Sequence, residues 1–338
     1  MISFEKNMKD NTKLFFCVIT FFIFTSCTTT SLNHLQKKVG FYVKDTVLYD
    51  SNNVPFVMRG VNHMHTWYPN ETELALKAIR ETGCNTVRIV LSNGIQWQKN
   101  DKKSLKKIID LCKANNLVCV LEVHDTTGTK DEDSLLLAAE YFIEMKDILI
   151  GQEDYVIINV ANEWPVSSTQ ISLHVWKNGY AKIIPMLRNE GLAHTIMVDC
   201  AGGGQNVECI ELFGKDILNS DPLKNVIFSA HLYGKAGGTP EIIKKNISFA
   251  TDSNLCICVG EFGYKHTDGD IDEEFIVEYC QKEGIGYLAW CWKGNAPPVE
   301  YLDIAQSWDG SRLSPDWGYK LINGVNGIRA TSKPCSVF

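Results

Sequence analysis

Eight short apolar runs recur along the chain and constrain its fold more than any other feature. Neighbouring runs are 29 to 38 residues apart, and amphipathic stretches lie between them. The runs are centred near Met58, Ile89, Leu121, Asn159, Met197, Ser229, Val259 and Leu288. Buried parallel strands read as continuous apolar segments and are joined by covering helices. The pattern therefore predicts an α/β fold, a single (β/α)8 TIM barrel.

Glycines and a polar turn refine this prediction. Gly83, Gly191 and Gly284 follow the first, fourth and seventh predicted helices, where glycine favours the left-handed conformation that ends a helix. Ahead of the first barrel strand, segments 41–49 and 54–58 flank a polar turn at 50–53, which predicts a short β-hairpin across the bottom of the barrel. No shift in composition marks a second domain, so residues 40–338 are expected to form one catalytic barrel.

A doubly wound open sheet also alternates strands with helices and is the main alternative fold. Such a sheet typically carries a glycine-rich phosphate turn after its first strand. Here the first strand is followed by Asn62-His63-Met64-His65-Thr66-Trp67-Tyr68, a polar and aromatic segment. This segment is better suited to a sugar than to a phosphate.

The first 27 residues have the pattern of an export signal. Lys6, Lys9 and Lys13 precede an apolar run at 14–24, which is too short to span a bilayer as a mature helix. Small residues then lead to Cys27, as in a lipoprotein cleavage site, although the residue three places before it is Phe24 rather than the usual leucine. We therefore expect export, with Cys27 lipidated, residues 28–39 as a tether, and membrane attachment in the periplasm or at the cell surface only through the lipid. The alternative is ordinary secretion with cleavage elsewhere.

Charge and cysteine usage limit the possible partners. A formal net charge of -7 without a basic cluster argues against nucleic acid and is compatible with a neutral substrate bound by a monomer. Most of the 12 cysteines lie within apolar patterns and are predicted to be core residues. Cys200 and Cys209, which flank a glycine-rich loop, form the one pair to test for a disulfide. No cysteine or histidine spacing is typical of a zinc site, so no metal or cofactor is predicted.

Polar residues follow most of the predicted strands, at the barrel end where catalytic groups of this fold lie. They are Asn62, His63, Arg88, Glu122, His124, Asp125, Asn162, Glu163, Asp199, His231, Tyr233, Glu261 and Lys293, accompanied by Trp164, Trp290 and Trp292. Glu163 and Glu261 close the fourth and seventh strands and would face one basin. Two such carboxylates can cleave a glycosidic bond if one is protonated and the other ionised. Arg88 is the cation expected to keep one of them ionised.

Simpler interpretations exist for each of these residues taken alone. A single glutamate at a strand end often caps a helix or faces solvent. His63 and His124 could form hydrogen bonds to residues behind the site rather than contact a substrate. Trp67 and Trp292 could serve packing as readily as sugar binding. The joint pattern favours a carbohydrate site, with Trp290 or Trp292 stacking on a pyranose ring.

The motifs VRIVLSNG, VLEVHD, VIINVANEW, HLY, VGEFG and LAWCWKGN, in this order, resemble glycoside hydrolase family 5. The similarity runs from about Gly40 to Phe338, includes FVMRGVNH and HTWY, and is greatest to the β-mannanases found in Bacillus species. It implies a retaining endo-β-1,4-mannanase that acts on mannan, glucomannan or galactomannan without a cofactor.

The resemblance also implies individual roles. Glu163 matches the acid/base and Glu261 the nucleophile, with carboxylates about 5 Å apart. Asn162 would bond the sugar 2-hydroxyl, Arg88 and Tyr233 would hold Glu261 ionised, and Trp290, rather than Trp292, would stack at the cleaved sugar. His124, His231 and Trp67 complete the supporting set. Departures from the family pattern are local: segment 201–204 lacks an aromatic residue, Pro165 follows NEW, and Cys291 separates the two tryptophans.

Three other functions remain open at this point. An endo-β-1,4-glucanase would share the catalytic set, since mannose and glucose differ only at C2. A metal-dependent amidohydrolase would begin with a His63-x-His65 pair, but its later ligands are missing. A glycan-binding protein without activity could keep the barrel, although both glutamates are present here.

Overall fold

The computed structural model describes residues 40–338. The expected signal peptide, Cys27 and the tether lie outside the described residues. Within the described part of the chain, no helix has the length and apolarity needed to cross a membrane.

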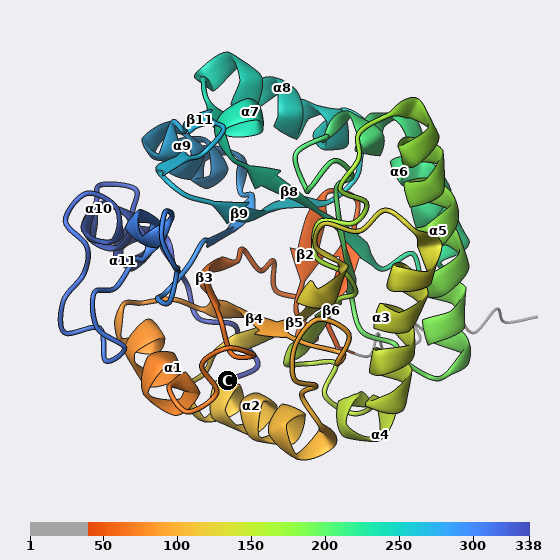
Figure 1. The fold of residues 1–338 in the computed structure, drawn as a ribbon, viewed down its shortest axis with the longest axis horizontal. Coiled ribbons are helices and arrows are strands. Elements are labelled where there is room, and N and C mark those ends of the chain that lie inside the picture. Colours follow the sequence, from red (N-terminus) through yellow and green to blue (C-terminus); the bar gives the residue numbers. More distant parts are fainter. Residues whose placement is uncertain (1–39) are drawn as a thin grey trace, which may run out of the picture. The chain divides into compact units, whose positions relative to one another are not determined.

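Eight parallel strands close into a barrel in the order β12-β3-β4-β5-β6-β7-β8-β9, which confirms the predicted fold (Figure 1). Seven of the eight predicted centres lie within strands, and Met58 lies one residue before β3. The barrel strands are β3 (Arg59–His63), β4 (Thr86–Leu91), β5 (Val118–Val123), β6 (Val156–Asn159), β7 (Ile196–Asp199), β8 (Val226–Leu232), β9 (Ile257–Phe262) and β12 (Gly286–Ala289).

Helices surround the barrel and connect its strands (Figure 1). They are α1 (Thr72–Glu81), α2 (Lys102–Ala114), α3 (Glu132–Glu144), α4 (Lys146–Leu149), α5 (Gln170–Asn189), α6 (Glu208–Ser220), α7 (Gly234–Gly237), α8 (Pro240–Thr251), α9 (Glu273–Glu283), α10 (Gly318–Asn323) and α11 (Ile328–Thr331), with 3-10 turns at His124–Thr126 and Glu300–Leu302. Side-chain caps begin several of them; Asp101, for example, accepts the Ser104 amide at 2.8 Å. The predicted stops are confirmed, since Gly83, Gly191 and Gly284 all have positive φ.

A hairpin packs across the bottom of the barrel, and the chain reverses direction twice in this region. Strand β1 (Tyr42–Lys44) pairs with β2 (Val47–Tyr49) through a reversal at 45–46 that the sequence did not indicate, where Asp45 has a φ of 55°. The predicted turn at 50–53 is confirmed as a second reversal, in which the Asp50 carboxylate accepts the amides of Asn52 and Val54, and Tyr49 forms an antiparallel bridge with Pro55. Polar content alone favoured the second turn, because a left-handed Asp45 has no distinct signal in the sequence.

Apolar side chains from the hairpin join the interior of the barrel. Phe41 and Leu48 belong to one buried cluster with Val118, Ile157 and Leu288, whose strands contribute them to the lower part of the barrel. A larger cluster fills the layer between strands and helices. The opposite, carboxyl end of the strands is left for polar groups.

All ten cysteines of the described region are buried and free. This confirms the prediction that most cysteines act as core residues. The thiols of Cys200 and Cys209 share a hydrogen bond, but no disulfide joins them in the structure.

Candidate active site

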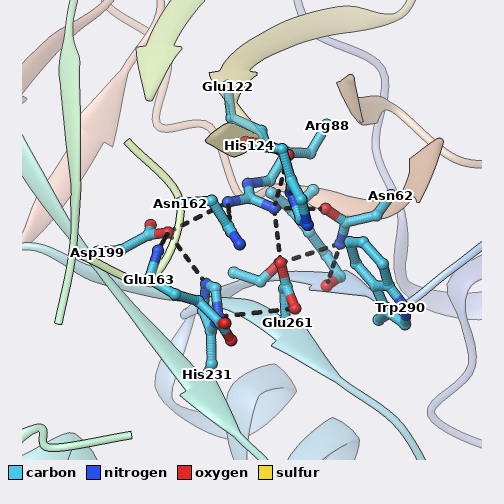
Figure 2. Close-up of polar contacts among 12 residues, drawn as sticks. Asn62, Arg88, Glu122, His124, Asn162, Glu163, Asp199, His231, Glu261 and Trp290 are labelled. Carbon is cyan, nitrogen blue, oxygen red and sulfur yellow. Dashed lines mark hydrogen bonds and ion pairs between the residues drawn. The ribbon is translucent and has the colours of Figure 1, made fainter. Parts of the chain in front are cut away.

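Side chains from β4, β6, β7, β8 and β9 meet at the carboxyl end of the barrel (Figure 2). Arg88 lies within β4, Glu163 follows β6 and Asp199 ends β7, while His231 and Glu261 lie near the ends of β8 and β9. A parallel barrel brings these ends together because every strand points the same way. The structure thus brings these five predicted residues together in one basin, whereas His63 contacts Thr72 and Lys293 pairs with Asp303.

Glu163 lies just beyond β6 in a left-handed backbone conformation, with a φ of 54°. Such a conformation is unfavourable for a glutamate and needs support from its surroundings. Asp199 provides this support by accepting the Glu163 amide at 3.1 Å. The Glu163 side chain then contacts His231 Nδ1 through Oε1 at 3.1 Å and remains 21 % exposed.

Glu261 is more enclosed, with a side chain that is 5 % exposed. Arg88 Nη1 donates to its Oε1 at 2.8 Å, and the Tyr233 hydroxyl donates to its Oε2 at 2.8 Å. Burial raises the pKa of the Glu261 carboxyl, while the charges of His231 and Arg88 oppose this rise. Two donors on its two oxygens make Glu261 an acceptor, as a nucleophilic carboxylate requires.

The two glutamates lie close enough to act on one bond. Glu163, His231 and Glu261 each offer one donor atom, and these three atoms lie within 4.8 Å of one another. Within residues 40–338 this is the one group of three that could hold a metal ion. One oxygen of each carboxylate thus lies within 4.8 Å of the other, which is short enough for a retaining glycosidase, with roughly 5–5.5 Å between its carboxyl groups, and too short for an inverting one.

Arg88 is the centre of the buried network. Besides Glu261, it donates to Asn159 at 2.8 Å, to Asn162 at 2.7 Å and to Asp199 at 3.2 Å, and Asn62 accepts at 2.9 Å. Burial lowers the pKa of Arg88, but the charges of the surrounding carboxylates outweigh burial and raise it. The guanidinium therefore stays charged and orients side chains from the ends of four other strands, β3, β6, β7 and β9.

His231 is the second cation of the basin. Its ring lies between Glu163 and Asp199, with Nε2 3.3 Å from Asp199 Oδ2. Burial lowers the pKa of His231, yet the charges of Glu261 and Asp199 outweigh this effect and raise it to about 10. Burial likewise raises the pKa of Asp199, but His231 and Arg88 hold it well below its usual range. The imidazolium and the Asp199 carboxylate thus form a buried ion pair beside Glu163.

Comparison with known proteins agrees with this chemistry. The family model described as cellulase (glycosyl hydrolase family 5) matches residues 49–296. The chain belongs to glycoside hydrolase family 5. It is 49 % identical over 299 residues to a mannan endo-1,4-β-mannosidase of Salipaludibacillus agaradhaerens, a match that spans 88 % of this chain and 96 % of the relative. A mannan endo-1,4-β-mannosidase of Cellvibrio japonicus is 41 % identical, over 90 % of this chain and 70 % of the relative.

Solved structures show the same family 5 barrel. The β-mannanase from Thermomonospora fusca superposes with a TM-score of 0.84 at 39 % identity, over 88 % of this chain and 99 % of that chain. A mannohexaose complex of the Thermomonospora fusca enzyme matches with a TM-score of 0.83.

Aromatic rings form one wall of the family 5 site. Trp290 is 9 % exposed and stacks with His124, their ring centroids 5.8 Å apart. Trp67 contacts His124 edge-on at 5.2 Å, so three of the predicted binding residues are neighbours. Burial lowers the pKa of His124, but the charge of Glu122 and its hydrogen bond of 2.8 Å outweigh burial and raise it.

Trp292 does not belong to this wall. Its side chain is fully buried, and its Nε1 donates to the Trp308 carbonyl at 3.0 Å. Of the two roles expected for Trp292, packing and sugar contact, its burial supports packing, and Trp290 is the tryptophan that lines the site. Side chains alternate between the two faces of an extended segment, so Trp292, two residues after Trp290, would share its face only if the backbone stayed regular. The strand β12 ends at Ala289, before either tryptophan.

Trp97 is a member of the wall that sequence reasoning missed. It contacts Trp67 edge-on at 5.0 Å and His124 at 5.7 Å. Its loop is held by Asp125, whose carboxylate accepts the amides of Asn93, Ile95 and Gln96 at 2.7–3.0 Å. The Asn93-Gly94 turn after β4 was the available signal, but only the Asp125 contacts define where the turn directs Trp97.

His63, which ends β3, and His65, which follows it, do not form a metal site with the residues of the basin. His63 Nε2 and His65 Nδ1 both contact the Thr72 hydroxyl, at 3.0 and 2.7 Å, at the start of α1. Burial lowers the pKa of His63 to about 3 and that of His65 to about 4. The two rings act as neutral hydrogen-bonding groups, which removes the structural basis for the amidohydrolase alternative.

Proposed function

We propose that the protein is a monomeric, retaining endo-β-1,4-mannanase that cleaves internal bonds of mannan, glucomannan or galactomannan. The observation that carries the mechanism is the short separation of Glu163 and Glu261, whose closest oxygens lie within 4.8 Å. Support for mannan as substrate comes from relatives 49 % and 41 % identical, both named mannan endo-1,4-β-mannosidase.

Glu261 acts as the nucleophile. One carboxylate oxygen attacks the anomeric carbon, the bond from this carbon to the glycosidic oxygen breaks, and its electron pair stays with that oxygen. Arg88 and Tyr233 hold the two Glu261 oxygens from the sides, which limits the directions from which the carboxylate can meet the sugar. The ordering of these donors before substrate arrives lowers the barrier.

Glu163 acts as acid and then as base. Its Oε1 contacts His231, whereas its Oε2 has no hydrogen bond to a described residue and is free to carry the proton for the leaving oxygen. Once the first product departs, water attacks the anomeric carbon, Glu163 takes its proton, and the ester bond to Glu261 breaks. The configuration at the anomeric carbon is retained.

Asn162 and the aromatic wall position the sugar. The Asn162 carbonyl accepts from Arg88 and its amide donates to Thr127 at 2.8 Å, which leaves a second amide hydrogen for the sugar 2-hydroxyl. Trp290 offers an apolar face for the sugar at the cleaved bond, and Trp67 extends this surface. Because mannose and glucose differ at C2, the Asn162 contact lies where specificity is decided.

Substrate preference is tested by measuring reducing ends released from glucomannan, galactomannan and carboxymethylcellulose. We expect release from the first two and a fast fall in viscosity, which indicates internal cleavage. Activity confined to carboxymethylcellulose would replace the proposal with an endoglucanase. Binding of mannan without product would indicate a non-catalytic glycan-binding protein. Light scattering during gel filtration measures the molar mass of the protein in solution, and the mass of one chain is expected for a monomer.

The roles of the two glutamates are tested with azide and an aryl β-mannobioside that has a good leaving group. In Glu261→Ala, azide takes the place of the nucleophile and should give an α-mannosyl azide. In Glu163→Ala, azide should attack the covalent intermediate and give a β-mannosyl azide. The same anomer from both variants would refute the assignment. Glu163→Gln and Glu261→Gln, which conserve side-chain size, serve as controls for folding.

We further propose that residues 1–27 direct export and that Cys27 carries the lipid. This rests on three lysines, the short apolar run and the small residues before Cys27. Palmitate labelling in a bacterial host should mark the parent chain but not Cys27→Ser. The variant should also move from the membrane to the soluble fraction. A parent chain that is exported without label would show ordinary secretion instead.

A further inference from the structure

A small hairpin lies between β9 and α9, close to the proposed nucleophile in the chain. It is formed by β10 (Lys265–His266) and β11 (Gly269–Asp270), and it begins three residues after β9 ends. Two polar side chains near its tip, those of His266 and Asp268, have no role in the mechanism described above.

The Asp268 carboxylate connects three loops at the catalytic end of the barrel. Its Oδ1 accepts from His266 Nδ1 at 2.9 Å and from the Gly234 amide at 3.1 Å. Its Oδ2 accepts from Gln205 Nε2 at 3.2 Å and from the Lys235 amide at 3.3 Å. Gln205 follows β7, the two amides follow β8, and His266 follows β9. Burial raises the pKa of Asp268, but the bonds from His266 and Gln205 outweigh it, so the carboxylate is ionised.

One of these contacts leads to the nucleophile. The His266 ring packs against the Tyr233 ring, with centroids 4.6 Å apart and planes tilted by 33°. Tyr233 in turn donates to Glu261 at 2.8 Å. The hairpin also lies directly on the backbone that follows Tyr233, because a Cβ built on Gly234 would come within 2.5 Å of the Gly269 nitrogen.

A second contact leads to the acid/base. Gln205 adjoins Gly204, whose carbonyl accepts the His231 amide at 2.9 Å. A Cβ on Gly204 would lie 2.4 Å from His231 Cγ, so this loop packs tightly on the imidazole that contacts Glu163. Gly204, in the segment 201–204 that lacks the expected aromatic residue, thus makes room for the ring.

We propose that Asp268 is a positioning residue of the reaction. Through His266 it orients the Tyr233 hydroxyl toward Glu261, and through Gln205 it holds the loop that packs on His231. The inference rests on the proposed roles of the two glutamates. Catalytic groups must be held within a fraction of an ångström, and a residue that orients them affects rate more than binding.

The main test compares Asp268→Ala with Asp270→Asn. Asp270 lies in the same hairpin, is exposed, and its carboxylate makes no hydrogen bond or ion pair to the described residues, so its variant is the matched control. For Asp268→Ala we expect kcat to fall by about 10- to 100-fold with KM changed by less than about threefold. Asp270→Asn should keep both constants. A fall of less than about twofold in Asp268→Ala would refute the proposal.

A double-mutant cycle with Tyr233→Phe separates positioning from a general structural effect. If Asp268 acts mainly through Tyr233, Asp268→Ala should lower kcat by a much smaller factor in the Tyr233→Phe background than in the parent. Equal losses in both backgrounds would overturn the path through His266 and Tyr233. His266→Phe keeps a ring against Tyr233 but removes the hydrogen bond to Asp268, so it should lower kcat by a smaller factor than His266→Ala.

The Glu261 titration is a readout that does not depend on the polymer cleaved. A misplaced Tyr233 hydroxyl would stabilise the ionised carboxylate less, so the pKa of Glu261 should rise further in Asp268→Ala. Carbon-13 NMR can follow this group, with its resonance assigned by its loss in Glu261→Gln. The other groups that face Glu261 are Arg88, His124, Glu163, His231 and Cys291, and none is altered. An unchanged titration would contradict the inference, whereas a parent enzyme inactive on every mannan would contradict only the proposed function.

Discussion

Thr72→Val tests whether the two histidines after β3 are structural groups. The Thr72 hydroxyl is buried and contacts His63 Nε2 at 3.0 Å and His65 Nδ1 at 2.7 Å. Valine conserves the shape but leaves a nitrogen on each ring without this partner. A buried polar group that loses its hydrogen bond costs about 1–3 kcal/mol, so we expect the free energy of unfolding to fall by about 2–5 kcal/mol.

Thr66→Val is the matched control, because the Thr66 hydroxyl oxygen is buried and bonds to no atom of residues 40–338. Its replacement should change stability by less than about 0.5 kcal/mol or increase it, since no bond is lost. Urea unfolding at pH 7.5, followed by tryptophan fluorescence and far-ultraviolet circular dichroism, measures both variants. Equal losses in the two variants, or a loss below about 0.5 kcal/mol in Thr72→Val, would refute the reasoning.

Three further predictions concern pH, the arginine and the tryptophans. Burial lowers the pKa of three histidines, His63, His65 and His194, to about 3 or 4, below the value near 6.5 in the unfolded chain. The unfolded chain therefore binds more protons in this range, and the free energy of unfolding should fall by about 2 kcal/mol for each histidine as the pH decreases from 6.5 to 4.5. Urea unfolding midpoints across this pH range measure the loss. Arg88→Lys should lower kcat by about 100-fold or more because lysine cannot hold Glu261, Asn162 and Asp199 together, and unchanged steady-state kinetics would contradict this. Trp292→Ala should lower the free energy of unfolding by about 3–5 kcal/mol, because the side chain is fully buried. Trp290→Ala should chiefly raise KM for manno-oligosaccharides. The reverse pattern would indicate that Trp292, rather than Trp290, contacts the substrate.

The barrel could be predicted because its signal is repeated. Each strand is a short apolar run buried on both faces, and an error in one run leaves seven others to define the period. The reversal at Asp45, which has a φ of 55°, had no such support, whereas the polar segment at 50–53 correctly marked the second reversal.

The meeting of Glu163 and Glu261 could be predicted because position along a strand implies position in space. Glu163 follows β6 and Glu261 lies near the end of β9, and the strands of a barrel end at one face. Contacts made by loops are different, since a loop's path depends on what it rests upon. Asp268 lies six residues beyond the end of β9, and only the hairpin returns it to Gln205 and Gly234. The choice between packing and sugar contact for Trp292 stayed open for a similar reason, because the chain leaves the regular strand β12 before reaching it.

Opposite charges pair with one another in the basin at the carboxyl end of the barrel. The basin contains four carboxyl groups, those of Glu122, Glu163, Asp199 and Glu261, within a network whose firm cations are Arg88 and His231. Asp199 is paired with both cations, and Glu261 accepts from Arg88 and lies 3.6 Å from His231. Glu163 is the most exposed of the four, and its Oε2 has no hydrogen bond to a described residue. It is therefore the carboxyl group of the basin that a leaving oxygen or a water molecule can reach, which is the access that its proposed role requires.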